Sequence, residues 1–131
     1  MKFLLLIYAN PENWEHPLFL RNPQFLAMPA AEREALTRQA EALSQELDES
    51  GELLTAVPLA DPLTTRTVRV RDNVLTTTDG PYLEAKEQLA GYDVVECESV
   101  ERAIEIAARI PDARFGAVEI HPIMGVFGLE M

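Results

Sequence analysis

Two spacings of apolar residues run through this chain, one typical of strands and one of helices. Residues 2–8 (KFLLLIY) are apolar on both faces of a pleat, which predicts a strand covered on each side. Residues 30–50 carry an apolar stripe at helical spacing, and Gly51 is expected to end that helix. Helices can cover one face of the first strand. In so short a chain, a partner subunit is the expected cover for the other face.

The remaining elements are predicted from alternation and from turn residues. Asp72-Asn73 indicates a two-residue hairpin turn, because small polar residues tolerate positive φ. Ser99 suits the N-cap of a second helix that ends at Pro111. The inner stripe of this helix is predicted to be Val100, Ala103, Ile104 and Ala107. Strands are expected over residues 52–59, 67–71, 74–78, 91–97 and 117–121.

Residues 10–29 are the least regular part of the chain. Four prolines in this stretch exclude a continuous helix, yet its leucines and aromatic residues are too many for a disordered linker. We expect an ordered Pro/aromatic excursion folded over the strand ends as a lid. His16 lies here, and a single histidine in a loop is usually solvated.

The predicted order defines the fold class. Strands and helices alternate as strand, helix, strand, hairpin, strand, helix, strand, and removing the hairpin leaves βαββαβ. This is the order of a ferredoxin-like α+β fold with an inserted hairpin. With 131 residues, the chain is long enough for a hydrophobic core and is predicted to be one domain, 1–131.

Charge and cysteine content narrow the classes of partner. The chain has 22 acidic and 11 basic residues and a net charge of −11, which disfavours nucleic acid and anionic membranes as partners. The apolar run 3–7 is too short for a signal peptide, and no stretch approaches the ~20 apolar residues of a membrane span. Cys97 is the single cysteine and is expected to be packed, which fits a reducing cytoplasm.

The segment 76–92 (TTTDGPYLEAKEQLAGY) is the strongest candidate for a site wall. Asp79-Gly80-Pro81 indicates a sharp turn, since Gly80 can take positive φ and Pro81 fixes its own φ. A titratable cluster of Glu84, Lys86 and Glu87 follows it. A surface loop with solvated charges is the alternative interpretation. The nearby Arg69 and Arg71 are expected to pair with Asp79 or Glu84 rather than with an anionic ligand.

This segment resembles the signature of the DGPF proteins, a branch of the YciI-like (YCII-related) superfamily. The match runs through Asp79-Gly80-Pro81-Tyr82 and residues 84–92, with Tyr82 where the family usually has Phe and Ala90 where it has a second Gly. Residues 2–8, 107–111 and 118–122 also resemble that family, so the likeness covers most of the chain. The resemblance implies a ferredoxin-like, dimeric α+β barrel.

The expected fold has a cleft over the helix-free face of its sheet, and a ligand could bind there. A carboxylate and a histidine or lysine in a partly apolar pocket can exchange protons with a small substrate. Catalytic candidates are Asp79, Lys86 and His121, and ligand-pocket candidates are Tyr8, Asp79, Tyr82, Lys86, Glu87 and Tyr92. His16, His121 and Cys97 show no metal-ligand spacing, so neither a metal nor a cofactor is expected.

Two functions from different classes follow from the resemblance. Likeness to YciI-like dehydrochlorinases implies a homodimeric, cofactor-free lyase or isomerase acting on a small molecule. In some relatives a His–Asp pair is thought to act, but the position of its helical histidine is Ala40 here, and Asp61 is the candidate acid. The alternative is a non-catalytic binding or regulatory module, because DGPF-type domains are associated with extracytoplasmic-function sigma factors.

Overall fold

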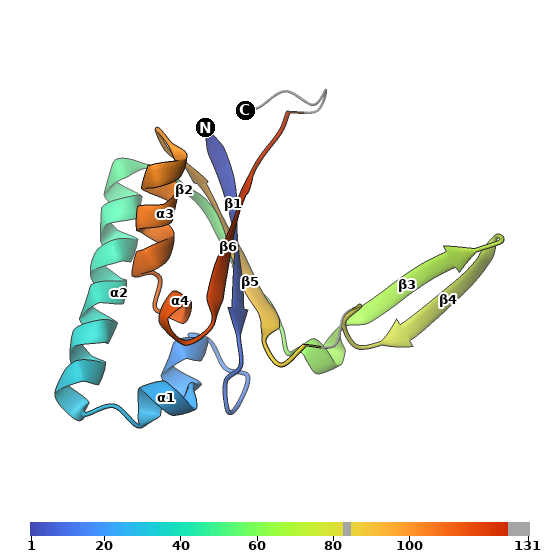
Figure 1. Ribbon diagram of the computed structural model, residues 1–131, viewed down its shortest axis with the longest axis horizontal. Coiled ribbons are helices and arrows are strands. Elements are labelled where there is room, and N and C mark those ends of the chain that lie inside the picture. The colour runs from blue at the N-terminus through green and yellow to red at the C-terminus, as the bar shows by residue number, and fades with distance from the viewer. Residues whose placement is uncertain (83–84, 126–131) are drawn as a thin grey trace.

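A four-stranded antiparallel sheet organises the protein, and a computed structural model describes residues 1–82 and 85–125 of it (Figure 1). The strands lie in the order β2-β5-β1-β6. This is the strand order of a ferredoxin-like α+β fold, as the sequence predicted. The bounds are β1 Lys2–Ala9, β2 Leu53–Pro58, β5 Gln88–Glu96 and β6 Ala117–Pro122.

Two helices cover one face of this sheet, α2 (Ala30–Ser50) and α3 (Val100–Arg109) (Figure 1). Their apolar side chains pack on the strand residues that face them, and Phe3, Leu5 and Val95 are completely buried there. Ser99 caps α3, its Oγ accepting a hydrogen bond from the Arg102 amide at 3.1 Å, as expected. Cys97 is buried in the same core, and this burial raises the pKa of its thiol.

The buried stripe of α3 differs from the predicted one. Ala103 and Ala107 are buried as expected, but Ile106 is fully buried while Ile104 is 54% exposed and Val100 is also exposed. Residues 103, 106, 107 and 110 form one i, i+3, i+4, i+7 row, and this row faces the sheet. The predicted stripe was therefore displaced around the helix, because it favoured Ile104 over Ile106.

The excursion at 10–29 folds onto the lower ends of the strands. It contains a 3₁₀ turn, η1 (Leu18–Arg21), and a short helix, α1 (Pro23–Leu26). Trp14 donates a hydrogen bond from Nε1 to the Leu59 carbonyl at 2.9 Å, which attaches the excursion to the chain beyond β2. A second short helix, α4 (Asp112–Phe115), follows α3 and lies beside the same end of the sheet (Figure 1).

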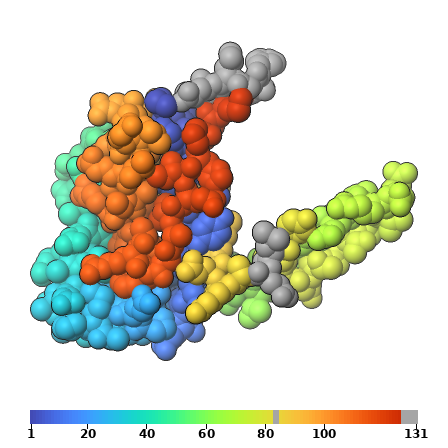
Figure 2. All heavy atoms as spheres, viewed as in Figure 1, coloured from blue at the N-terminus to red at the C-terminus, as the bar shows by residue number. Residues whose placement is uncertain are grey.

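The inserted hairpin projects from the body as an arm, residues 66–79, formed by β3 (Arg66–Arg71) and β4 (Val74–Asp79). Figures 1 and 2 show that it stands clear of the helices and the four-stranded sheet along most of its length. Asp72 and Asn73 form its two-residue turn with φ of 51° and 63°, which confirms that prediction.

The Asp79-Gly80-Pro81 turn closes the base of the arm. Gly80 has φ of 93°, and its amide donates to the Thr65 carbonyl at 2.7 Å, so the two ends of the arm meet. Asp79 pairs with Arg66 at 3.1 Å, whereas Arg69 lies over the ring of Tyr82 at 4.8 Å from its centroid. The expected pairing of Arg69 or Arg71 with Asp79 is therefore wrong, because Arg66 is the residue directly opposite Asp79 in the hairpin.

The sheet face away from the helices is called the open face here. Alternation along the strands places Leu4, Leu6, Tyr8, Tyr92 and Val94 on it, all half-buried. These residues confirm that β1 is apolar on both faces. Within the described residues, no helix is packed over them (Figure 1).

Two sequence features lie outside the described residues. One is the C-terminal tail, 126–131, whose apolar residues predict that it packs on the protein or on a partner. The other is Glu84 of the predicted titratable cluster, within 83–84. Among the helices that are described, none has the length and apolar character needed to cross a membrane.

Gly116→Ala is expected to destabilise the fold by about 1–3 kcal/mol. A Cβ at this position would lie 2.2 Å from the backbone oxygen of Tyr8, so the start of β6 would have to separate from β1. Gly51→Ala is the control, because its Cβ would meet open space and only the positive φ of 73° would be strained. Chemical denaturation of the two variants should show the larger loss at Gly116. Equal losses would contradict the predicted clash.

Candidate functional site

The residues predicted from the signature segment lie at the base of the arm, and most of them face solvent. Asp79 and Tyr82 are exposed, as are Lys86 and Glu87. Asp79 lines a hollow between the arm base and the segment after β1, together with Asn10, Asp61 and Gln88. The contacts of Asp79 and Gly80 give this turn a structural role in holding the two ends of the arm together.

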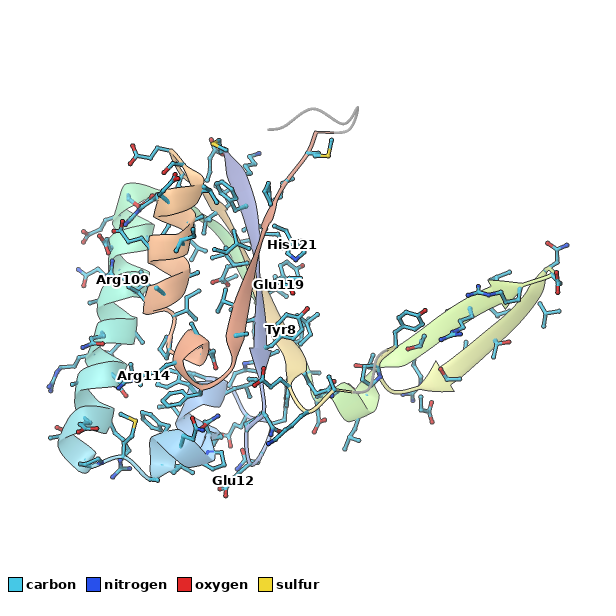
Figure 3. The ribbon with its side chains drawn as sticks, viewed as in Figure 1. Tyr8, Glu12, Arg109, Arg114, Glu119 and His121 are labelled. Atoms are coloured by element: carbon cyan, nitrogen blue, oxygen red, sulfur yellow. The ribbon has the colours of Figure 1, made fainter. Side chains whose placement is uncertain are left out.

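The other predicted residues lie on the open face. Tyr8, Glu119 and His121 project from β1 and β6 on the side away from the helices (Figure 3). His121 and Glu119 form a hydrogen-bonded pair, with 2.7 Å between Nε2 and Oε1. Burial and the neighbouring Glu119 carboxylate raise the pKa of the Tyr8 hydroxyl. Asp79 and His121 are thus in different parts of the protomer, whereas Tyr8 and His121 share one surface.

A second set of titratable side chains lies on the opposite, helix-facing side of the sheet. These side chains line a cavity that we call the Asp93 pocket. It has a volume of about 190 Å³, and Asp93 from β5, Asp112 from α4 and His16 from the excursion all line it. The other walls are largely apolar, formed by Ile7, Pro17, Leu18, Ala56, Val57, Pro58, Ala90 and Gly91. Three elements that are distant in sequence therefore bring two carboxyl groups and an imidazole to one small cavity.

The environment of this pocket raises the pKa of both of its carboxyl groups. Burial raises the pKa of Asp93 to about 6, and the negative charge of Asp112 adds to the rise. Burial also raises the pKa of Asp112, an effect opposed by a hydrogen bond from its own backbone amide and by the charge of His16. A carboxyl group with a pKa near 6 can both donate and accept a proton close to neutral pH.

The imidazole of His16 is oriented by the backbone. Its Nε2 lies 2.7 Å from the Leu59 carbonyl, and because a carbonyl only accepts, Nε2 must carry the proton of that hydrogen bond. Nδ1 is then the ring nitrogen that can accept a proton. The Trp14 ring packs edge-on against the imidazole, with 6.1 Å between centroids. His16 is therefore exposed, as expected of a loop histidine, but its ring is positioned by this hydrogen bond.

Asp93 and Asp112 also line a larger adjoining hollow of about 570 Å³. Leu43 and Ala40 of α2 contribute to its wall. Ala40 is the position at which some relatives are thought to carry their helical histidine. Asp61, the candidate acid of that pair, lies elsewhere and caps η2 (Pro62–Thr64) by accepting from the Leu63 amide at 2.9 Å. The acidic residues that line the same hollow as Ala40 are Glu41, Asp93 and Asp112.

Asp93 and Asp112 were missed by the sequence analysis, although one of them left a signal. Alternation along the predicted strand 91–97 places Tyr92 and Val94 on one face and Val95 and Cys97 on the other, and the structure confirms this. Asp93 lies two residues before Val95, so the same alternation places an acidic residue on the buried face. Asp112 gives no comparable signal, because its proximity to Asp93 arises only from the tertiary fold.

Comparison with known proteins places these features in a family. A model of the YCII-related domain matches residues 1–126 of this chain. The chain belongs to the YCII-related domain family. It is also 29% identical to an uncharacterized protein of Rhizobium meliloti (strain 1021) over 94 residues, which are 70% of this chain and 76% of that protein. The broad family prediction is thereby confirmed, while the DGPF branch stays a prediction.

The described residues of this YCII-related protein show no group of three or more His, Cys, Asp or Glu side chains arranged to hold a metal ion. The Asp93 pocket combines His16 with two carboxyl groups in a cavity, but not in a ligand arrangement.

Proposed function

We propose that this YCII-related protein carries out cofactor-free acid–base chemistry on a small molecule in the Asp93 pocket. The observation that carries the proposal is the convergence of Asp93, Asp112 and His16 on one small, partly apolar cavity. Such a combination of titratable groups in a cavity is typical of sites that move protons. The volume of about 190 Å³ is below the ~300–1,000 Å³ of drug-sized pockets and favours a small substrate.

The two carboxyl groups and the imidazole have separate roles in this proposal. Asp93, with its pKa of about 6, is the group that takes a proton from substrate or returns it. Asp112 keeps that pKa high, because two neighbouring carboxylates resist being ionised together. His16, held through Nε2 on the Leu59 carbonyl, presents Nδ1 as a second acceptor. A substrate C–H or O–H proton could then move between two positioned groups without a metal.

The resemblance to relatives with a helical histidine supports this assignment. Position 40, where that histidine is expected, is alanine here, yet it borders the hollow that adjoins Asp93 and Asp112. His16 reaches the same region from the excursion, so it supplies the imidazole that α2 lacks. We therefore propose a lyase-like or isomerase-like reaction in a modified site, and, from the resemblance of residues 79–92, membership of the DGPF branch.

We also propose that the protein is a homodimer formed through the open face. Leu4, Leu6, Tyr92 and Val94 are only half-buried in one protomer, and hiding such apolar surface from water favours association. Two sheets facing each other would enclose Tyr8, Glu119 and His121 between them. This is the arrangement that the resemblance implies, and it leaves the Asp93 pocket on the outer, helix-facing side of each sheet.

Hydrogen–deuterium exchange into substrate carbon tests the proposed chemistry. The protein is incubated in D₂O with small α-hydroxyketones such as dihydroxyacetone, and the loss of C–H signal is followed by proton NMR. The wild-type protein is expected to accelerate exchange. Asp93→Asn should slow it at least ~100-fold, the usual contribution of a general acid or base. His16→Gln should also slow it while leaving the fold intact.

Two controls make the result specific. Glu119→Gln removes a carboxylate from the open face and is expected to leave the exchange rate unchanged, as is Lys86→Ala at the base of the arm. If Asp93→Asn keeps full exchange activity while Glu119→Gln loses it, the site is on the open face and this proposal is wrong. Binding of an α-hydroxyketone without any exchange would favour the non-catalytic module instead.

A further inference from the structure

We propose that the arm, residues 66–79, packs against a second copy of this chain, beside the open face of that copy. This inference rests on the homodimer proposed above but is independent of the chemistry in the Asp93 pocket. It assigns a function to the part of the molecule that contributes least to its own core.

Several apolar side chains of the arm are exposed to solvent, although side chains of this kind are usually buried. In the described residues β3 and β4 pair with each other and with no third strand. Val68, Val70 and Leu75 lie on one face of the hairpin and are 59%, 56% and 67% exposed. A two-stranded hairpin is marginally stable by itself, so a partner that covers this face would stabilise it.

The direction of the arm indicates which molecule covers it. In Figure 1 the helices lie on one side of the four-stranded sheet, and the arm extends toward the other side. Figure 3 shows Tyr8, Glu119 and His121 of the open face on that same side. A second copy docked on the open face would therefore occupy the space beside the arm. Two-fold symmetry would give each protomer an arm against its partner.

The shape of the arm base supports an extended contact. The arm and the body enclose a hollow of about 760 Å³, whose apolar walls include Val68, Val70, Tyr82 and Leu89. Tyr82 and Leu89 are themselves exposed, although both lie where the chain returns to the sheet. Arg66, Arg69 and Arg71 also line this hollow, so a partner surface that filled it would meet both apolar and cationic side chains.

Charge favours a second copy over other partners. The arm contains Arg66, Arg69 and Arg71 against Asp72 and Asp79, while the rest of the chain carries 20 acidic and 8 basic residues. The arm is thus the cationic part of an acidic protein, and it is complementary to the body of another copy. The acidic Glu96 and Glu119 lie on the open face that such a copy would present.

Removal of the arm tests the inference in the full-length protein. The Gly80 amide and the Thr65 carbonyl are 2.7 Å apart, so residues 66–79 can be replaced by a short glycine link without disturbing the sheet. Sedimentation equilibrium should then give a dimer Kd at least ~10-fold higher than that of the wild type, a loss of about 1.4 kcal/mol. Circular dichroism should show that the body remains folded.

Point variants locate the contact on one face of the arm. Val68→Glu with Leu75→Glu places charge on the apolar face and is expected to raise the dimer Kd as much as removal of the arm. Thr76→Glu is the matched control, because Thr76 is on the opposite face, paired with Arg69. Benzoylphenylalanine at position 70 should cross-link the two protomers on irradiation, with the link in residues of the partner's open face.

Three results would overturn the inference. The wild-type chain could be monomeric at every concentration tested, or the armless protein could dimerise with unchanged Kd. The cross-link could also form within one chain or to a different protein. If Leu6→Glu abolishes the dimer while arm removal has no effect, the open-face dimer stands and only the arm inference fails. The exchange assay on the Asp93 pocket distinguishes these outcomes from a failure of the proposed chemistry.

Discussion

Replacing Asp93 with asparagine is expected to make the folded protein more stable at neutral pH while removing its proton-exchange activity. The buried carboxyl group has a pKa of about 6, against an ordinary value of 3.8, so ionising it in the folded state costs free energy. Asparagine has a similar shape and no charge. The gain should be about 1–3 kcal/mol at about pH 8, allowing for partial solvent exposure of the side chain.

The sign of the pH dependence follows from proton binding. Between the ordinary pKa of 3.8 and the folded value of about 6, the folded state holds a proton on Asp93 that the unfolded state has lost. The stabilisation from this proton is complete below pH 3.8 and is lost as the pH rises through about 6. The hydrogen bond from Arg102 lowers the pKa of Glu52. Ionised Glu52 therefore stabilises the folded state above its ordinary pKa of 4.5, and this stabilisation is lost as the pH falls below that value.

Thermal melts of the wild type and Asp93→Asn across this pH range are the measurement. The two melting temperatures should nearly coincide at about pH 4 and diverge by several degrees toward about pH 8. Asp112→Asn is a second test, because removing the neighbouring charge should lower the pKa of Asp93 in a carboxyl NMR titration. A variant that is less stable than the wild type at every pH would show that Asp93 is held by favourable contacts instead.

Ile106→Ala should cost about 2–5 kcal/mol of unfolding free energy. Ile106 is fully buried between α3 and the sheet, where the lost methyl and methylene groups would leave a cavity. Against a total stability of about 5–15 kcal/mol for such a domain, this is a large loss.

Ile104→Ala is the matched control on the same helix. Ile104 is 54% exposed, so its truncation should change the free energy of unfolding by no more than about 0.5 kcal/mol. Urea denaturation of both variants, with equal m-values, checks the pair. Comparable losses at the two positions would mean that α3 packs on the sheet through the stripe expected from the sequence, which included Ile104.

Much of the fold could be predicted because its signals are local. The apolar residues on both faces of β1 and the apolar stripe of α2 can each be recognised within one continuous segment. Asp72-Asn73 indicates its turn because both residues tolerate positive φ. The predicted stripe of α3 was displaced because Ile104 and Ile106 lie on nearly opposite sides of the helix, and either side could face the sheet. Periodicity alone does not decide between Ile104 and Ile106; the geometry of the sheet does.

The candidate site was harder to predict because its parts come from separate regions. Signature residues such as Asp79 and Lys86 stand out along the chain, yet the structure shows Asp79 in contacts that close the arm. His16 was interpreted as a solvated loop residue, since nothing nearby in sequence reveals the Leu59 carbonyl that orients it. The projection of the arm away from the body is equally a tertiary property, with no counterpart in its alternating pattern.

Neighbouring residues of β5 lie on two different surfaces of the sheet. Tyr92 belongs to the open face and Asp93 to the pocket on the reverse side. Because successive side chains of a strand point to opposite faces of the sheet, a substitution at Tyr92 alters the proposed dimer interface without replacing any residue of the Asp93 pocket.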